Sequence, residues 1–178
     1  AEDLDSIIEI PEPKKPGGRE EITITGYNKG SEHFFAVIAE DERGQRSPIS
    51  NVVRAIAPDH NPPDGILDLN AESGKSDGEI DLMWTAPGDD GIDGQAHKYQ
   101  IKCSKDRIRT IWDFYSADDV PNSDEVPSPN PAGSRESFTV TGLERRETYY
   151  FAIKTMDKWD NIGPLSKVAE AMATDKMA

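Results

Sequence analysis

The chain has 178 residues, and its 34 acidic residues against 20 lysines and arginines give a formal net charge of −14. So acidic a surface repels nucleic-acid phosphates and anionic lipid headgroups, which disfavours binding to DNA, RNA or a membrane surface. Hydrophobic residues make up 35% of the chain, a lean content that still suffices for a globular β domain. The acidity fits either an affinity for cations such as Ca²⁺ or a solvated surface that keeps the protein soluble.

Cys103 is the only cysteine, which rules out an internal disulfide and a cysteine-based zinc site. It falls inside an alternating strand pattern, where a small strand side chain is expected. No apolar run approaches the roughly 18 residues that a membrane-spanning helix needs, and no signal-peptide pattern is present.

An internal repeat organises the chain. The first 62 residues match the last 62 at a constant offset of 116 without a gap, with about 20 identities. Residues 17–20 fall on 133–136, and residues 22–26 fall on 138–142. The repeat predicts that residues 1–60 are the C-terminal half of one repeat and that residues 61–178 are a complete domain.

Short strand patterns follow a proline-rich linker at residues 59–65. Ile80, Leu82 and Trp84 lie at a spacing of two and therefore on one face of a strand. Segments of similar character recur between turn signals, with no long helical pattern. This arrangement predicts an antiparallel β-sandwich. The predicted strands are residues 66–71, 79–84, 99–103, 138–140, 149–153 and 168–172.

One insert, at residues 104–131, is long for a loop between neighbouring strands. It contains apolar residues at i, i+3, i+4 and i+7, which predict a short amphipathic helix laid against the sandwich. Asp106 or Ser104 is the expected N-cap. The apolar stripe comprises Ile108, Ile111, Trp112 and Tyr115.

These patterns resemble the fibronectin type III module. The markers are Ile80-x-Leu82-x-Trp84, then Tyr99-x-Ile101, then the run at residues 143–153. The resemblance implies an all-β fold of tandem immunoglobulin-like sandwiches, the first only a C-terminal half, with a short helix inserted in the second. It also implies that Tyr149 forms a tyrosine corner, whose hydroxyl bonds a backbone group upstream. The implied structural residues are Trp84, Tyr99, Leu143 and Tyr149.

A narrower resemblance rests on the Trp-Thr-Ala-Pro-Gly-Asp-Asp-Gly string at residues 84–91 and on two further matches at 94–101 and 131–138. These segments are similar to a subtype of the fibronectin type III module that is found in two settings. One is the carboxy-terminal β domain of the calcium-activated chloride channel regulators, and the other is large secreted or surface-attached bacterial proteins. The first copy departs from the pattern, because His33 replaces the corner tyrosine and Tyr27 replaces the preceding leucine.

Catalytic motifs are missing from the sequence: the three histidines are scattered, and no zinc-protease, nucleophile-elbow or phosphate-binding pattern occurs. We therefore expect no enzyme activity. The strongest polar cluster is Asp89, Asp90 and Asp93, three carboxylates among glycines that could offer oxygens to Ca²⁺. The cluster lacks the spacing of an EF-hand loop, and the alternative interpretation is that these residues are turn and cap residues. No cofactor is expected beyond this candidate calcium.

Two tryptophans, Trp112 and Trp159, are the aromatic residues expected nearest the surface and are candidate contacts for a sugar or a protein. Trp159 lies in a turn, and the first copy has Arg43 at the matching position.

The half repeat poses a physical problem, because its apolar strand residues would have nothing to cover them. Three explanations fit: a fragment, a cleaved protein whose pieces stay associated, or a disordered half repeat. We expect a protein partner or a companion fragment that completes the first repeat, and no nucleic acid or membrane insertion.

Three functional hypotheses follow. The first is a non-catalytic extracellular or cell-surface module that mediates spacing or protein–protein contact within a larger multidomain protein. The second is the C-terminal β region of a self-processing metalloprotease similar to the channel regulators. The third is a carbohydrate-binding accessory module of a secreted hydrolase.

Overall fold

The computed structural model describes residues 12–176, which fall into two compact units divided between Asp59 and His60. The outermost parts of both predicted domains, residues 1–11 and 177–178, lie outside the described residues. All the sheets are antiparallel, which confirms the all-β fold class.

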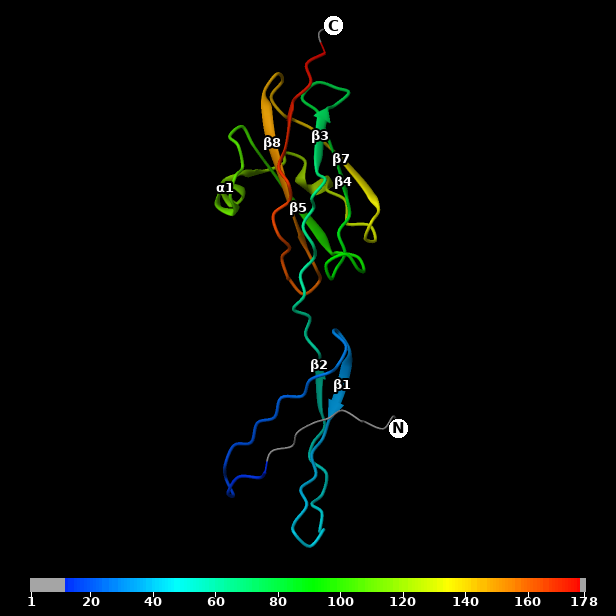
Figure 1. Ribbon diagram of the computed structural model, residues 1–178, viewed down its shortest axis with the longest axis vertical. Helices are drawn as coiled ribbons and strands as arrows, with labels where there is room; N and C mark the ends of the chain where they lie inside the picture. Colours follow the sequence, from blue (N-terminus) through cyan, green and yellow to red (C-terminus); the bar gives the residue numbers. More distant parts are fainter. Residues whose placement is uncertain (1–11, 177–178) are drawn as a thin grey trace. The chain divides into compact units, whose positions relative to one another are not determined.

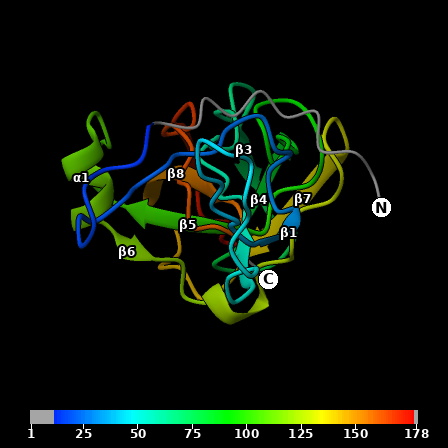
Figure 2. The same ribbon diagram turned by 90° about the horizontal axis from the view of Figure 1, so that it is seen from below.

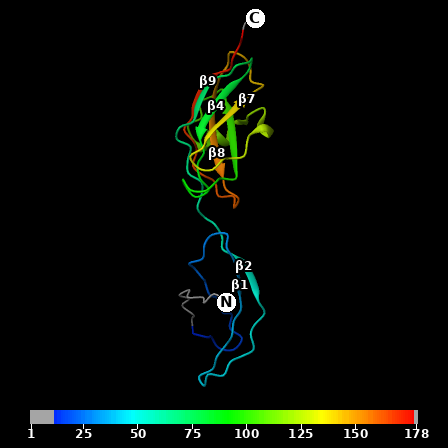
Figure 3. The ribbon, with the colours of Figure 1, turned by 90° about the vertical axis from the view of Figure 1, so that its right-hand side faces the viewer.

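Two sheets make up the second unit (Figures 1 and 3). The three-stranded sheet has the order β3-β4-β7 and the four-stranded sheet the order β6-β5-β8-β9. The first sheet consists of β3 (Asn70–Ser73), β4 (Ile80–Thr85) and β7 (Arg135–Val140). The second consists of β6 (Asp118–Asp119), β5 (Lys98–Ser104), β8 (Thr148–Met156) and β9 (Ala169–Met172).

Strand alternation builds the core between these sheets. Burial alternates residue by residue along β4, and Ile80, Leu82 and Trp84 are essentially inaccessible. The facing sheet supplies Tyr99, whose ring stands perpendicular to that of Trp84 at a centroid distance of 5.2 Å. The apolar faces read from the sequence are thus the faces that the two sheets bury against each other.

Strand β8 is the central strand of its sheet and the longest in the described chain. It pairs with β5 over seven residue pairs and with β9 over four. Its Phe151 and Ile153 are buried in the sandwich core, whereas Ala152 is buried against the inserted helix. A strand covered on both faces reads as a continuous apolar run, as residues 149–153 do.

The inserted helix is present as α1 (Ile111–Ser116), beside the β5–β8 sheet in Figure 2. Its N-cap is Thr110, so the predicted caps Ser104 and Asp106 are wrong. The Thr110 side chain accepts from the Asp113 backbone N–H, and the Asp113 carboxylate accepts from the Thr110 backbone N–H, which completes a capping box. A hydrogen bond from the Arg109 backbone N–H, joined by the hydrogen bonds with Thr110, lowers the pKa of the Asp113 carboxyl.

The apolar stripe of this helix also needs correction. Phe114, which the stripe omitted, is the fully buried helix residue, while Trp112 is 75% exposed and Tyr115 is 52% exposed. Ile108 is buried but precedes the helix. The stripe failed because it assumed a helix already formed at Ile108, whereas the capping box starts the helix three residues later and changes which side chains face the sheet.

The turn into β8 has the geometry of a tyrosine corner. The Tyr149 hydroxyl accepts a hydrogen bond from the Glu144 backbone N–H at 3.2 Å. Leu143, just upstream, is buried in the same core. This bond ties the turn at residues 143–147 to the strand that follows it.

The first unit contains one two-stranded sheet, of β1 (Glu32–Phe35) and β2 (Val53–Ile56). The repeat aligns residues 22–24 with the predicted strand at residues 138–140 and so implies a strand near Ile22 and Ile24, which is not formed. In the second unit the equivalent strand, β7, pairs with β4. No hydrophobic side chain among residues 12–59 is buried, which fits the expectation of an incomplete sandwich.

We predict that Tyr149→Phe destabilises the second unit by about 1 kcal/mol, because it removes one hydroxyl hydrogen bond and leaves the packing of the ring in place. Urea unfolding followed by tryptophan fluorescence measures the change. Tyr150→Phe is the matched control, since its hydroxyl makes no hydrogen bond within residues 12–176. Equal stability of the two variants would contradict the role of the corner.

Candidate functional site

The acidic loop at residues 88–94 is closed by its own backbone. The Gly88 N–H donates to the Gly91 carbonyl at 2.8 Å, and the Asp89 N–H donates to the Asp93 carbonyl at 2.7 Å. A Cβ on Gly88 would lie 2.0 Å from the Asp93 carbonyl oxygen, so only glycine fits there. Gly91 has a φ of 61°, which glycine adopts without strain.

This closure decides where the predicted metal ligands lie. Asp89 and Asp90 are half-buried, and each offers a carboxylate oxygen within 4.8 Å of the other's. Asp93 is exposed and stands outside this group. The loop therefore brings together two of the three predicted carboxylates, and calcium binding stays a prediction.

A second acidic residue, Asp157, organises the turn after β8. One oxygen of its carboxylate accepts from the backbone N–H groups of Trp159 at 2.7 Å and Asn161 at 2.8 Å, and the other accepts from the Asn161 side chain at 2.7 Å. The Asp157 residue is only 1% exposed. A buried carboxylate with this many donors shapes the loop, as Asx-turns do.

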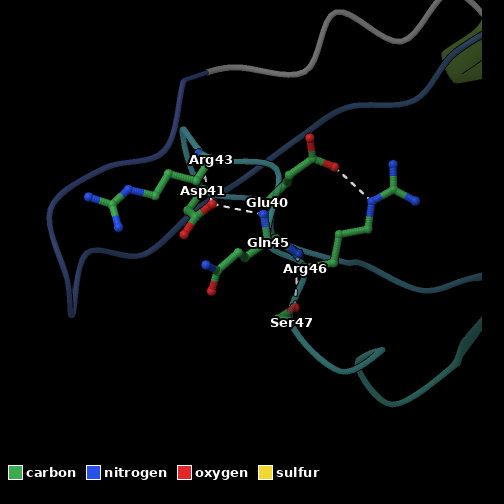
Figure 4. A network of polar contacts seen from close by, with 7 residues as sticks. Glu40, Asp41, Arg43, Gln45, Arg46 and Ser47 are labelled. Carbon is green, nitrogen blue, oxygen red and sulfur yellow. Dashed lines mark hydrogen bonds and ion pairs between the residues drawn. The ribbon is translucent and has the colours of Figure 1, made fainter.

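The first unit repeats this turn at Asp41, which Figure 4 shows among its polar neighbours. The Asp41 carboxylate accepts from the backbone N–H groups of Arg43 at 2.9 Å and Gln45 at 2.8 Å. Glu40 and Arg46 flank the turn with an ion pair of 2.7 Å. The turn around Trp159 was predicted from the sequence, but the role of its aspartate in both copies was not. The available signal was the identity of Asp41 and Asp157 at the offset of 116.

The two candidate contact tryptophans differ in accessibility. Trp112 is 75% exposed on α1. Trp159 is half-buried, and its indole Nε1 is enclosed without a hydrogen-bond partner in the described chain. Trp112 is therefore the better contact residue of the two, since a planar exposed ring offers apolar area for docking.

The remaining titratable groups of the core are structural. The buried Glu136 carboxylate accepts from the backbone and side-chain amides of Asn130 at 2.6 and 3.0 Å. Burial, reinforced by the Glu136 charge and opposed by Trp84, raises the pKa of the neighbouring Tyr99 hydroxyl. Burial and the adjacent carboxylates of residues 118–119 raise the pKa of the Cys103 thiol to about 11, which leaves the thiol protonated and unreactive at neutral pH.

Within residues 12–176, no helix has the length and apolar character needed to cross a membrane.

Comparison with known proteins places the chain beside one group of relatives. No family model matches it. Human calcium-activated chloride channel regulator 2 is 38% identical over 128 residues, covering 64% of this chain and 13% of the relative. Human regulator 1 is 36% identical over 143 residues, covering 78% and 15%, and the horse regulator 1 is 34% identical over 125 residues, covering 68% and 13%.

Solved structures with detectable likeness are more distant. An Fn3-like protein from Clostridium thermocellum has 16% identity and a TM-score of 0.42, covering 66% of this chain and 100% of that one. Domains A168-A170 of titin have 15% identity and a TM-score of 0.48, covering 90% and 51%.

The sandwich, its strand order and its tyrosine corner define a fibronectin type III-like β module. This module is homologous to one region of the calcium-activated chloride channel regulators. The chain spans about an eighth of the length of the curated relatives that it matches.

We predict that 1 mM CaCl₂ raises the thermal midpoint of the second unit by a few degrees if the acidic loop binds calcium, because a ligand that binds only the folded state stabilises it. Asp89→Asn together with Asp90→Asn removes the shift, whereas Asp93→Asn retains it. Differential scanning calorimetry with and without EGTA makes the measurement, and MgCl₂ at equal ionic strength is the control. An unchanged midpoint in the wild-type chain would end the calcium hypothesis.

Proposed function

We propose that this chain is a non-catalytic module of a larger extracellular or cell-surface protein, in which it provides spacing or protein–protein contact. The observation that carries the proposal is the tandem repeat itself: two units of one plan follow each other along the chain at residues 1–59 and 60–178. Tandem sandwiches commonly determine how far a surface protein extends, and their loops are available for contacts.

The start of the second unit supports a spacing role. The Gly91 N–H donates to the Pro62 carbonyl, and the Asp64 N–H donates to the Gly91 carbonyl, both at 3.2 Å. Pro63 between them is fully buried. The segment leading into the sandwich is thus fixed to the acidic loop, and its two prolines restrict the backbone further. A spacer benefits from such a conformationally restricted segment at the start of the domain, which a flexible linker does not provide.

The extracellular location rests on two further supports. One is the homology to the channel regulators, together with the resemblance of the sequence to secreted and surface-attached proteins. The other is the net charge of −14, which favours solubility and disfavours nucleic-acid partners. The buried, protonated Cys103 requires no reducing compartment.

We predict that replacing residues 62–175 in the full-length protein by an unrelated fibronectin type III sandwich of similar length preserves function if the role is spacing. Deletion of the same residues abolishes function in that case. The native function of each full-length variant is measured in the source cell. The amount of each variant at the cell surface is measured as well, which controls for misfolding. Loss of function in the replacement at normal abundance would instead assign a specific contact, and Trp112→Ala then tests the exposed indole.

A second candidate function is favoured by the identity of 34–38% to the regulators. Under this proposal the chain is the C-terminal β region of a self-processing, regulator-like metalloprotease. We predict that the coding sequence upstream then contains a His-Glu-x-x-His helix, whose two histidines bind zinc. Sequencing the complete gene decides this, and an upstream region without such a motif would contradict the candidate.

A carbohydrate-binding accessory role has one structural support, the exposed ring of Trp112, since sugars stack on accessible aromatic faces. A glycosidase domain upstream would favour this role over the other two.

A further inference from the structure

The hairpin of β1 and β2 in the first unit is the counterpart of β8 and β9 in the second. Glu32 pairs with Ile56 as Thr148 pairs with Met172, and the three other pairs also coincide at the offset of 116. The hairpin therefore has a definite register even though no third strand joins it in the described residues.

Hydrogen bonds beyond the strands coincide as well. The Val37 N–H donates to the Ser50 hydroxyl at 2.9 Å, as the Ile153 N–H donates to the Ser166 hydroxyl at 2.8 Å. The Ser50 N–H donates back to the Val37 carbonyl. The Asp41 turn described above closes the same hairpin. The first unit is thus a preformed half of the fold, and its exposed faces can be compared position by position with buried ones.

One face of this hairpin corresponds to the sandwich core. Val37 is 70% exposed, whereas its counterpart Ile153 is 1% exposed. Val53 is 53% exposed against 7% for its counterpart Ala169. In the second unit this face packs in one core with side chains of the opposite sheet, β3, β4 and β7, beside the buried side chains of β5. We call it the inner face.

The opposite face is also apolar and uncovered. Its exposed residues are Phe34, Ile49 and Val52, at 60–63% accessibility. Their counterparts in the second unit, Tyr150, Leu165 and Val168, pack with Ile108 and Phe114 at helix α1. We call it the outer face. An ordinary half-buried sheet would carry polar residues here, so the composition of this face indicates a helix-like cover.

One edge of β1 is open too. Its counterpart β8 pairs with β5 along seven residue pairs and extends over nine residues. Within residues 12–176, strand β1 pairs only with β2, and it extends over four residues. An unpaired strand edge presents N–H and C=O groups that favour pairing with an added strand.

We propose that both faces and the open edge are covered by one polypeptide segment with the same order of secondary-structure elements as residues 60–116. Its first two strands cover the inner face, its third strand pairs with β1, and its short helix covers the outer face. In the second unit one continuous stretch does all of this, because the chain leaves β5 and enters α1 directly. A lone docked strand would cover the edge alone, and a lone helix would cover only the outer face.

A second copy of residues 1–178 does not supply the segment by exchange. These residues hold two back halves, beginning at residues 1 and 117, and one front half, residues 60–116. That front half is already packed in its own second unit. Exchange between copies therefore leaves one back half uncovered in every chain. This inference stands independently of the proposed function, because it concerns how the first unit folds and not what the module does.

The test fuses an additional copy of residues 60–116 directly in front of Ala1, so that residue 116 of the added copy meets Ala1 as it meets Ala117 in the chain. Hydrogen exchange of the backbone amides of β1 is followed by mass spectrometry, with β8 as the internal reference. We expect the β1 amides to exchange at least about 100-fold more slowly than in the unfused chain, because they become paired and buried. Unchanged exchange in the fusion overturns the proposal.

The matched control carries Leu82→Asp and Ile101→Asp in the added copy only, which places unpaired charges on its apolar faces. In this control the β1 amides should exchange as in the unfused chain. If the control protected them as strongly as the unchanged fusion does, the proposal that the added segment packs specifically on the hairpin would be overturned. Analytical ultracentrifugation of the unfused chain gives a second readout. A dimer in which β1 is already protected would show that another copy covers the hairpin, and would likewise overturn the proposal.

Discussion

The pairing of β8 with β5 on one side and β9 on the other is the constraint on which the second unit depends. It places one strand at the centre of its sheet, where Phe151 and Ile153 enter the sandwich core and Ala152 meets the inserted helix. The tyrosine corner fixes the start of this strand, and the Asp157 turn fixes its end. With its backbone groups paired along both edges, this strand has no open edge to solvent.

The first unit has the sequence of the same repeat, but within residues 12–176 its strand β1 pairs with β2 on one side and has no partner equivalent to β5 on the other. The Asp41 turn and the hairpin register persist, because they depend on contacts local in sequence. The strand shrinks to four residues and the expected strand near Ile22 does not form, because both depend on partners distant in sequence. Comparison of the two copies thus separates what a hairpin stabilises alone from what only the closed sandwich stabilises. It also explains why the apolar residues of the first unit are exposed.

Prediction from the sequence was correct where one hydrophobic periodicity dominated a segment. It failed where a capping motif competed with such a periodicity. The alternation of Ile80, Leu82 and Trp84 predicted a buried face, since side chains on a strand alternate strictly. The helix was predicted correctly as an element, but its start and buried face were not, because the Thr110–Asp113 capping box outweighed the apolar spacing beginning at Ile108. The acidic loop was identified by its composition, yet composition does not encode that Asp93 is exposed and stands outside the group formed by the carboxylates of Asp89 and Asp90.

The sequence by itself determined the repeat, by residue identity at a constant offset, and the all-β class and strand faces, by the alternation of apolar residues. The position of the tyrosine corner followed from the resemblance to the fibronectin type III module. Only the tertiary structure decided which side chains lie exposed: Trp112 on its helix, the half-buried Trp159, and the two uncovered faces of the β1–β2 hairpin. Burial depends on what packs against a residue, and that neighbour is often far away in the sequence or, for the first unit, in a segment that residues 12–59 do not contain.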